Sequence, residues 1–186
     1  MSQSSQAVNY PGLFFACDSG LVDESTERNV LYGMYRNGAS IDLAQFSAAG
    51  GFDGTERCDI ISQEFNQANL NNQLKFITSG KEYDQNIVCA VDMFGTKCNL
   101  SWPASVTDRQ YTYLFTIANN ENPDIALNRF LTRLVSSRNV GQILQDSESQ
   151  QTYIDFEAYL QHAFGNVVDV STGQFTETPS ENHHFE

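Results

Sequence analysis

The chain has 186 residues, with 23 acidic and 10 basic side chains and a formal net charge of −13. Its 40% hydrophobic and 12% aromatic residues are enough for the packed core of one domain. The acidic excess argues against a nucleic-acid partner, because phosphate binding depends on clustered Lys and Arg, and no apolar stretch has the roughly 18 residues of a transmembrane segment.

The first half of the chain predicts three strands and one helix. We expect a polar leader over 1–10, strands over Leu13–Cys17, Asn29–Tyr35 and Ser40–Phe46, an acidic loop over Asp18–Glu27, and a turn at Arg36-Asn37-Gly38. From Thr55 the period changes, because Cys58, Ile61 and Phe65 fall at helical spacing.

The second half predicts further strands and two more helices. We expect strands over Gln73–Thr78, Asn86–Met93, Lys97–Trp102 and Gln110–Ala118, with turns at Ser79-Gly80-Lys81 and Phe94-Gly95-Thr96. Asn122-Pro123 predicts a helix start, with Asn as the cap and Pro at the first position. A third helix is expected over Gln151–Ala163, and an acidic tail over 169–186.

Consecutive strands joined by turns predict an antiparallel sheet, because a parallel sheet would need helical crossovers between its strands. The fold class is therefore α+β, with about five to seven strands packed against two to three helices. Residues 11–168 form the single domain in this interpretation.

The four cysteines, Cys17, Cys58, Cys89 and Cys98, contain no CxxC pair and match no zinc pattern. An even number in a lysine-poor chain favours two disulfides and an oxidising, extracytoplasmic compartment. Three pairings are possible, of which we favour Cys89 with Cys98, stapling one hairpin, and Cys17 with Cys58. The alternative is four buried free thiols, which alkylation without reductant would label. Residues 1–11 show no basic n-region or apolar h-region of a secretory signal.

Arg57 is the charged residue that stands out, because it precedes Cys58 at a helix start, where the helix dipole is positive. A solvated side chain would tolerate this position. The sharper hypothesis is a structural ion pair, in which Arg57 binds a strand carboxylate with two hydrogen bonds. Replacing Arg57 by Lys should then lower stability.

Candidate chemistry is sparse. A hydrolase could use paired carboxylates from among Asp18, Glu27, Asp53 and Glu56, but no spacing fixes two of them at the required separation. We expect no catalytic residue, no metal site and no cofactor.

Several short motifs resemble one family. They are Phe15-Ala16-Cys17, Glu56-Arg57-Cys58, Ile61-Ser62, Phe65, Leu74–Thr78, Gly80, Ile87-Val88-Cys89, Cys98, Leu114-Phe115-Thr116 and Asn122-Pro123. In their spacing they resemble the cyanobacterial circadian oscillating polypeptide family over roughly Leu13–Arg138. The resemblance implies an exported or membrane-peripheral cyanobacterial protein, and it supplies no catalytic residues.

The function we expect is a noncatalytic protein-binding module, an accessory or structural subunit of an extracytoplasmic or membrane-associated assembly whose partners are other protein subunits. The alternatives are a hydrolase with an unrecognised acidic site and a peripheral membrane protein. The last is weakened by the lack of a basic amphipathic face.

Overall fold

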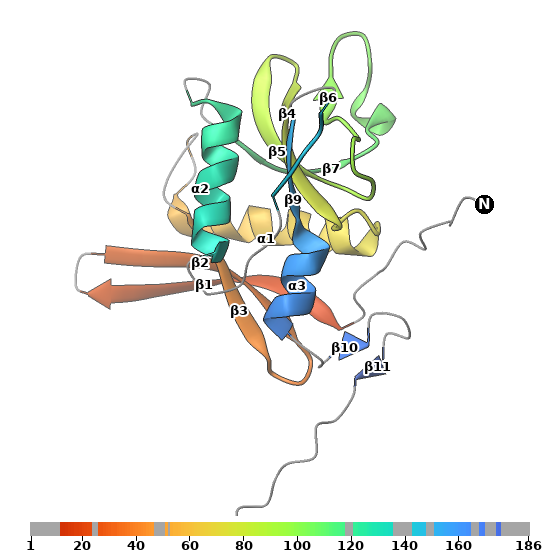
Figure 1. Cartoon of the computed structure of the whole chain (residues 1–186). Coiled ribbons are helices and arrows are strands. Elements are labelled where there is room, and N and C mark those ends of the chain that lie inside the picture. Colours follow the sequence, from red (N-terminus) through yellow and green to blue (C-terminus); the bar gives the residue numbers. More distant parts are fainter. Residues whose placement is uncertain are drawn as a thin grey trace, which may run out of the picture.

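One antiparallel sheet, a second sheet that is antiparallel except for one short strand, three α-helices and a short third ladder make up the described part of the chain, which confirms the α+β class (Figure 1). The structure is a computed structural model. It describes residues 12–23, 26–46, 51, 53–117, 121–135, 143–147, 151–164, 168–169 and 174–175. The predicted leader 1–10 and most of the predicted tail 169–186 lie outside these residues. Strands β10 (Val168–Asp169) and β11 (Gln174–Phe175) form the third ladder, in which Asp169 pairs with Gln174.

The first sheet is a three-stranded meander in the order β1-β2-β3, over Leu13–Asp23, Thr26–Tyr35 and Ser40–Phe46. The acidic loop expected over Asp18–Glu27 is wrong, because β1 runs on to Asp23 and Asp18 pairs with Val30. The ladder hydrogen bonds of an antiparallel pair come from the backbone and not from the side chains. Two strands that pair through an apolar stretch can therefore continue to pair through the polar stretch that follows it.

The second sheet has the order β7-β5-β4-β9-β8, and β6 pairs with β4 in the parallel sense. Its strands are β4 (Phe76–Glu82), β5 (Gln85–Val91), β6 (Asn99–Leu100), β7 (Thr112–Thr116), β8 (Ile143–Gln145) and β9 (Thr152–Asp155). β9 pairs with the beginning of β4 and β6 with its end, so β4 has neighbours along both edges.

The helices begin where short polar side chains can cap them. Helix α1 (Gly54–Leu70) starts after Asp53, whose carboxylate accepts the Glu56 amide at 2.7 Å. Helix α2 (Pro123–Val135) starts after Asn122, whose side-chain oxygen accepts the Asp124 amide at 2.8 Å, so the predicted start is confirmed. A single 3₁₀ turn, η1, spans Val106–Asp108.

The third helix, α3, covers only Phe156–Phe164, so the expected helix over Gln151–Ala163 is wrong in its first turn. Thr152–Asp155 is strand β9, and Tyr153 pairs with Thr78 of β4. Thr, Tyr and Ile favour an extended chain, and a free sheet edge beside them overrides the helical spacing of Tyr153 and Phe156. The helix begins where the Asp155 carboxylate can accept the Ala158 amide at 2.8 Å.

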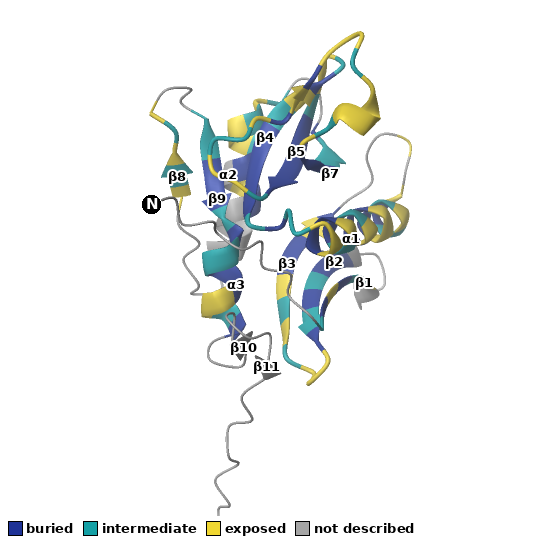
Figure 2. Ribbon diagram, turned by 90° about the vertical axis from the view of Figure 1, so that its right-hand side faces the viewer, coloured by how far each residue is buried: buried dark blue, intermediate teal, exposed yellow. Residues whose placement is uncertain are grey.

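The core lies on both faces of the second sheet. Ile77, Val88 and Ile154 point to the first face and join the large cluster that the helices and the first sheet complete. Phe76, Ile87 and Tyr153 point to the second face and form a smaller cluster. The connection from β5 to β7 contributes Cys98 to that second cluster. We call residues 92–110 of this connection the cover segment. Figure 2 shows the buried strands of both sheets beside the exposed outer side of α1.

Candidate binding surface

Strand β4 does not end at the predicted turn Ser79-Gly80-Lys81, but continues to Glu82. The turn to β5 is the pair Tyr83-Asp84, between the paired residues Glu82 and Gln85. Both turn residues have positive φ, 45° for Tyr83 and 69° for Asp84. A two-residue hairpin turn of this kind prefers Asn and Gly, and a bulky side chain there costs roughly 1–2 kcal/mol. The protein therefore holds Tyr83 in a strained position.

Gly80 lies inside the strand because another part of the backbone passes over it. A Cβ atom built at Gly80 would lie 2.7 Å from the Cys98 Cβ and closer still to the Cys98 carbonyl oxygen. The Lys81 amide donates to that carbonyl at 2.9 Å. Glycine in a strand often marks such an approach rather than a turn, which explains why the turn prediction at this position is wrong.

The cysteines form two pairs, Cys17 with Cys58 and Cys89 with Cys98, with Cα–Cα distances of 5.7 and 6.4 Å. Both distances lie in the usual range for disulfides. The first pair ties β1 to α1. The second does not staple a simple hairpin, because Cys98 precedes β6, which pairs with β4 and not with β5. It therefore links β5 to the cover segment over Gly80 of the intervening strand. Both pairs are compatible with an oxidising extracytoplasmic compartment.

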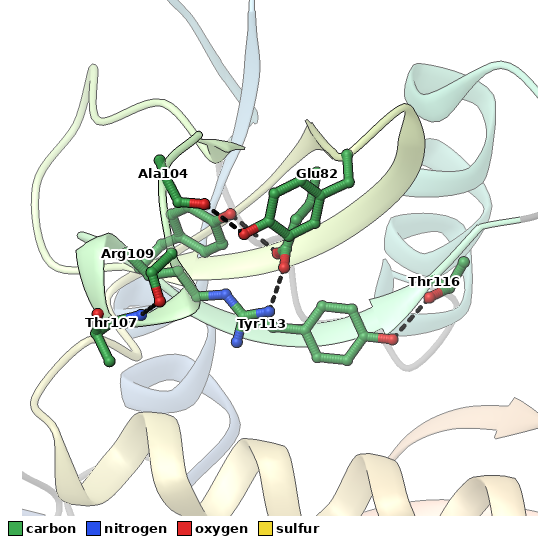
Figure 3. A network of polar contacts seen from close by, with 9 residues as sticks. Glu82, Ala104, Thr107, Arg109, Tyr113 and Thr116 are labelled. Atoms are coloured by element: carbon green, nitrogen blue, oxygen red, sulfur yellow. Dashed lines mark hydrogen bonds and ion pairs between the residues drawn. The ribbon is translucent and has the colours of Figure 1, made fainter. Parts of the chain in front are cut away.

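A carboxylate and a guanidinium close the other end of the cover segment (Figure 3). Glu82, the last residue of β4, is 7% exposed, and one of its carboxylate oxygens accepts a hydrogen bond from Arg109 Nη2. The Tyr111 hydroxyl donates to the other oxygen at 3.0 Å. The Arg109 guanidinium also lies 5.7 Å from the centre of the Tyr113 ring. Each charge is thus matched where it is largely withdrawn from water.

The pKa values around this pair follow from burial and from the carboxylate. Burial works against the charge of Arg109, but the hydrogen bond and charge of Glu82 outweigh it and raise the Arg109 pKa. Burial, together with the hydrogen bond and charge of Glu82, raises the pKa of Tyr111 to about 12. On α1, burial raises the pKa of Glu64, although the nearby Arg109 charge opposes it. The guanidinium therefore stays charged, and the phenol stays protonated, at neutral pH.

Between the strained turn and the ion pair, the structure exposes a large aromatic side chain. Trp102 is 82% exposed, and its ring centre lies 5.4 Å from that of Tyr83. The Tyr83 hydroxyl donates to the Ala104 carbonyl at 2.7 Å, and the Tyr83 amide donates to the Leu100 carbonyl at 2.8 Å. Val106, 52% exposed, begins the 3₁₀ turn that follows. We call Tyr83, Trp102 and Val106 the aromatic tip.

The conformation of the cover segment around the aromatic tip is fixed by local hydrogen bonds. The Ser105 hydroxyl accepts the Thr107 amide at 3.5 Å. It also accepts the amide of Asp108, whose carboxylate accepts the Ser105 amide at 2.7 Å, and this reciprocal pair forms a capping box. The next residue is Arg109, which the ion pair holds on β4. The segment that carries the exposed Trp102 is thus held in place both before and after this residue.

Arg57 is half-buried between β3 and β7. Its guanidinium lies 5.5 Å from the centre of the Phe46 ring, and Nη2 donates to the Thr116 carbonyl at 3.5 Å. Burial lowers the Arg57 pKa, and the charges of Tyr113 and Glu121 act in the opposite direction. These contacts place Arg57 at a ring and a carbonyl, and the ion pair with a strand carboxylate stays a prediction.

The acidic residues considered for hydrolysis lie at the start of α1 and on strands β1 and β2. Asp53 caps α1, Glu56 lies in the first turn of that helix, and Asp18 is an exposed residue of β1. Glu27 belongs to β2, and its side chain is outside the description. Within the described residues no group of three or more His, Cys, Asp or Glu side chains is placed to hold a metal ion.

The roles of Glu82, Arg109 and Trp102 are not predicted from the sequence. Trp102 is the only tryptophan of the chain and follows a strand, a signal that could have pointed to a surface function. The ion pair joins residues 27 positions apart, and it depends on β4 reaching Glu82. No sequence pattern indicated that extension.

No described helix is long and apolar enough to cross a membrane. Residues 15–161 match the model of a family described as circadian oscillating protein COP23. No curated protein and no solved structure matches the chain.

Proposed function

The chain belongs to the circadian oscillating protein COP23 family, and from this premise we propose that it is a noncatalytic protein-binding module. In this proposal it serves as an accessory or structural subunit of a cyanobacterial assembly that is extracytoplasmic or associated with a membrane. The partners are other protein subunits, and they bind at the aromatic tip.

The exposure of Trp102 supports this proposal most directly. Tryptophan is among the residues that dominate binding energy at protein interfaces, and an isolated soluble domain gains stability by burying it. Here the ring is 82% exposed, although it sits on a segment held by a disulfide, an ion pair and a capping box. A segment fixed in advance loses little conformational freedom on binding, which favours affinity.

The strained turn supports the same interpretation. Positive φ at Tyr83 lowers stability, yet it brings the tyrosine ring beside Trp102 and its hydroxyl to the Ala104 carbonyl. Backbone strain of this kind persists where the surrounding structure enforces it, often at binding sites. The turn therefore fits a surface whose geometry matters for binding.

The test is isolation of the full chain from its source organism under native conditions, with identification of co-purifying proteins by mass spectrometry. We expect a partner at fixed stoichiometry with the unaltered chain, and strong loss of that partner with Trp102→Ala, since truncating a central tryptophan typically costs about 2 kcal/mol or more of binding free energy. Leu70→Ala is the matched control, because Leu70 is 66% exposed at the end of α1.

Two results would contradict the proposal. If the chain is recovered alone as a monomer, it is not an assembly subunit. If Trp102→Ala keeps the partner as well as Leu70→Ala does, binding occurs elsewhere on the molecule. Sedimentation with membranes that resists high salt and needs no protein partner would favour the peripheral membrane alternative.

A further inference from the structure

We infer that the aromatic tip recognises a cationic segment of the partner protein, and that a Lys or Arg side chain of the partner lies on the ring of Trp102 between the carboxylates of Asp84 and Asp108. This inference rests on the proposed function and specifies the chemistry of its partner. It is carried by the chemistry of the tip and by the charge of the chain.

The ring of Trp102 offers the preferred aromatic surface for a cation. Tryptophan binds ammonium and guanidinium groups more strongly than tyrosine or phenylalanine, because its π-system is larger. One side of the ring is in contact with Tyr83, and 82% of the residue remains accessible. A partner side chain can therefore approach the ring without any rearrangement of the tip.

Two exposed carboxylates belong to residues next to members of the aromatic tip, Asp84 after Tyr83 and Asp108 in the turn that begins with Val106. Asp84 is the second turn residue, directly after Tyr83, and its side chain is 99% exposed. Asp108 closes the 3₁₀ turn, and the one hydrogen bond from the Ser105 amide leaves further acceptor positions on its carboxylate. Guanidinium groups favour such carboxylates because they can donate two parallel hydrogen bonds.

The basic residues nearby do not cancel this preference. Lys81 Nζ lies 3.4 Å from the Asp84 carboxylate, in a pair that is exposed and therefore exchangeable. Arg109 is matched by Glu82 beneath the tip. Each of these two pairs carries no net charge, and Asp108 adds one negative charge at the surface.

The charge of the whole chain selects among possible occupants. A net charge of −13 repels a second copy of the chain, an anionic lipid surface and nucleic acid. The same charge attracts a basic segment over distances of about a Debye length and speeds its encounter. A cationic polypeptide is the occupant that both the local and the overall charge favour.

The test uses the single tryptophan as its probe. The emission of Trp102 in the full chain is titrated with a peptide of alternating Gly and Arg, with a peptide of the same length in which citrulline replaces Arg, and with a proline-rich neutral peptide. Citrulline keeps the shape of arginine and removes its charge. We expect a saturable change only with the Arg peptide, and a dissociation constant that rises with salt concentration.

Variants then locate the binding by anisotropy of the dye-labelled Arg peptide. Trp102→Ala should weaken binding about 5- to 10-fold, as the loss of a cation–π contact predicts, and Asp84→Asn with Asp108→Asn should weaken it by at least a few-fold. Leu70→Ala and Asp59→Asn, both at exposed positions on α1, are the matched controls and should bind as the unaltered chain does.

Each other outcome overturns the inference. Equal binding of the citrulline or the proline-rich peptide, lost in Trp102→Ala, would show a tip that binds without cation recognition, and the proposed function would stand. Binding of the Arg peptide that Trp102→Ala leaves unchanged would show attraction to the net charge alone. No emission change with any peptide would reject cation recognition, whereas the proposed function is judged separately by native isolation.

Discussion

At the scale of single residues, Gly80 shows how one missing side chain shapes the candidate surface. It lets Cys98 lie directly over β4, and the β6 pairing and the path to Trp102 follow from that crossing. In the sequence, Ser79-Gly80-Lys81 has the composition of a turn. The pattern cannot distinguish a glycine that bends the chain from one that another segment covers, because both need the absence of a Cβ atom.

Gly80→Ala tests this role. The added methyl group would meet the Cys98 backbone, which cannot yield as a flexible side chain would, so we expect the free energy of unfolding to fall by about 3 kcal/mol or more. Urea denaturation provides the measurement. Ser79→Ala is the control, because it changes the neighbouring residue on the opposite face of β4 and should cost much less. Equal losses for the two variants would contradict the close approach.

Tyr35 and Tyr111 make stability depend on alkaline pH. Burial raises the pKa of each to about 12, with Glu82 contributing at Tyr111, against an ordinary value near 10 in the unfolded chain. The folded state therefore holds these protons more tightly. Their stabilisation is complete below about pH 10 and is lost as the pH rises towards 12.

We expect the free energy of unfolding to fall over that range, and to fall less steeply in Tyr111→Phe, which has no proton to lose. Denaturation at a series of alkaline pH values measures the slope, and the absorbance of tyrosinate reports the ionisation itself. Identical slopes for the unaltered chain and Tyr111→Phe would mean that the Tyr111 phenol ionises alike in both states.

At the scale of elements, the sequence predicts helices better than strand ends. The spacing of Cys58, Ile61 and Phe65 predicts α1, and Asn122-Pro123 predicts the start of α2, because caps and apolar faces are local signals. The ends of β1 and β4 and the helical turn replaced by β9 depend on pairing with distant strands. A ladder can extend or divert a segment regardless of its own pattern.

For the cover segment the sequence predicts the pairing of Cys89 with Cys98 and none of the other contacts that attach it. Its attachment uses Glu82 with Arg109, Cys89 with Cys98, and Phe94, whose ring centre lies 4.8 Å from that of Tyr153. Each contact joins positions whose meeting follows from the register of the second sheet. The sequence shows the residue types, and the sheet decides which of them meet.

A double-mutant cycle on Glu82 and Arg109 tests how the segment is held. Either Glu82→Gln or Arg109→Met alone leaves a poorly solvated charge, and we expect each to lower the free energy of unfolding by about 2–3 kcal/mol. The double variant should cost clearly less than the two losses combined, with a coupling of at least about 1 kcal/mol, because it leaves neither charge unmatched.

The same cycle on Lys81 and Asp84 is the matched control on the neighbouring exposed pair, where we expect a coupling close to zero. Additive losses at Glu82 and Arg109 would mean that the pair does not act as a unit. Trp102 emission measured on the same variants would then report whether the tip keeps its environment when the ion pair is removed.

At the scale of the whole molecule, the net charge of −13 acts on stability as well as on partners. Like charges spread over one domain repel one another, and folding brings them closer together than they are in the unfolded chain. Salt screens that repulsion, with a Debye length of about 10 Å at 0.1 M ionic strength and 30 Å at 0.01 M. Stability should therefore depend on ionic strength even where individual ion pairs contribute little.

We expect the melting temperature to rise by roughly 2–4 °C as sodium chloride is increased from about 0.01 to 0.3 M, which corresponds to about 1 kcal/mol for a chain of this size. Asp59→Lys with Gln63→Lys, at exposed positions on α1, makes the chain less negative and should reduce the response. Asp59→Glu with Gln63→Glu makes it more negative and should enlarge the response. A melting temperature that falls with salt would show that attractive pairs such as Glu82 with Arg109 outweigh the overall repulsion. In that case the ion pairs, and not the net charge, would determine how the stability of this fold depends on salt.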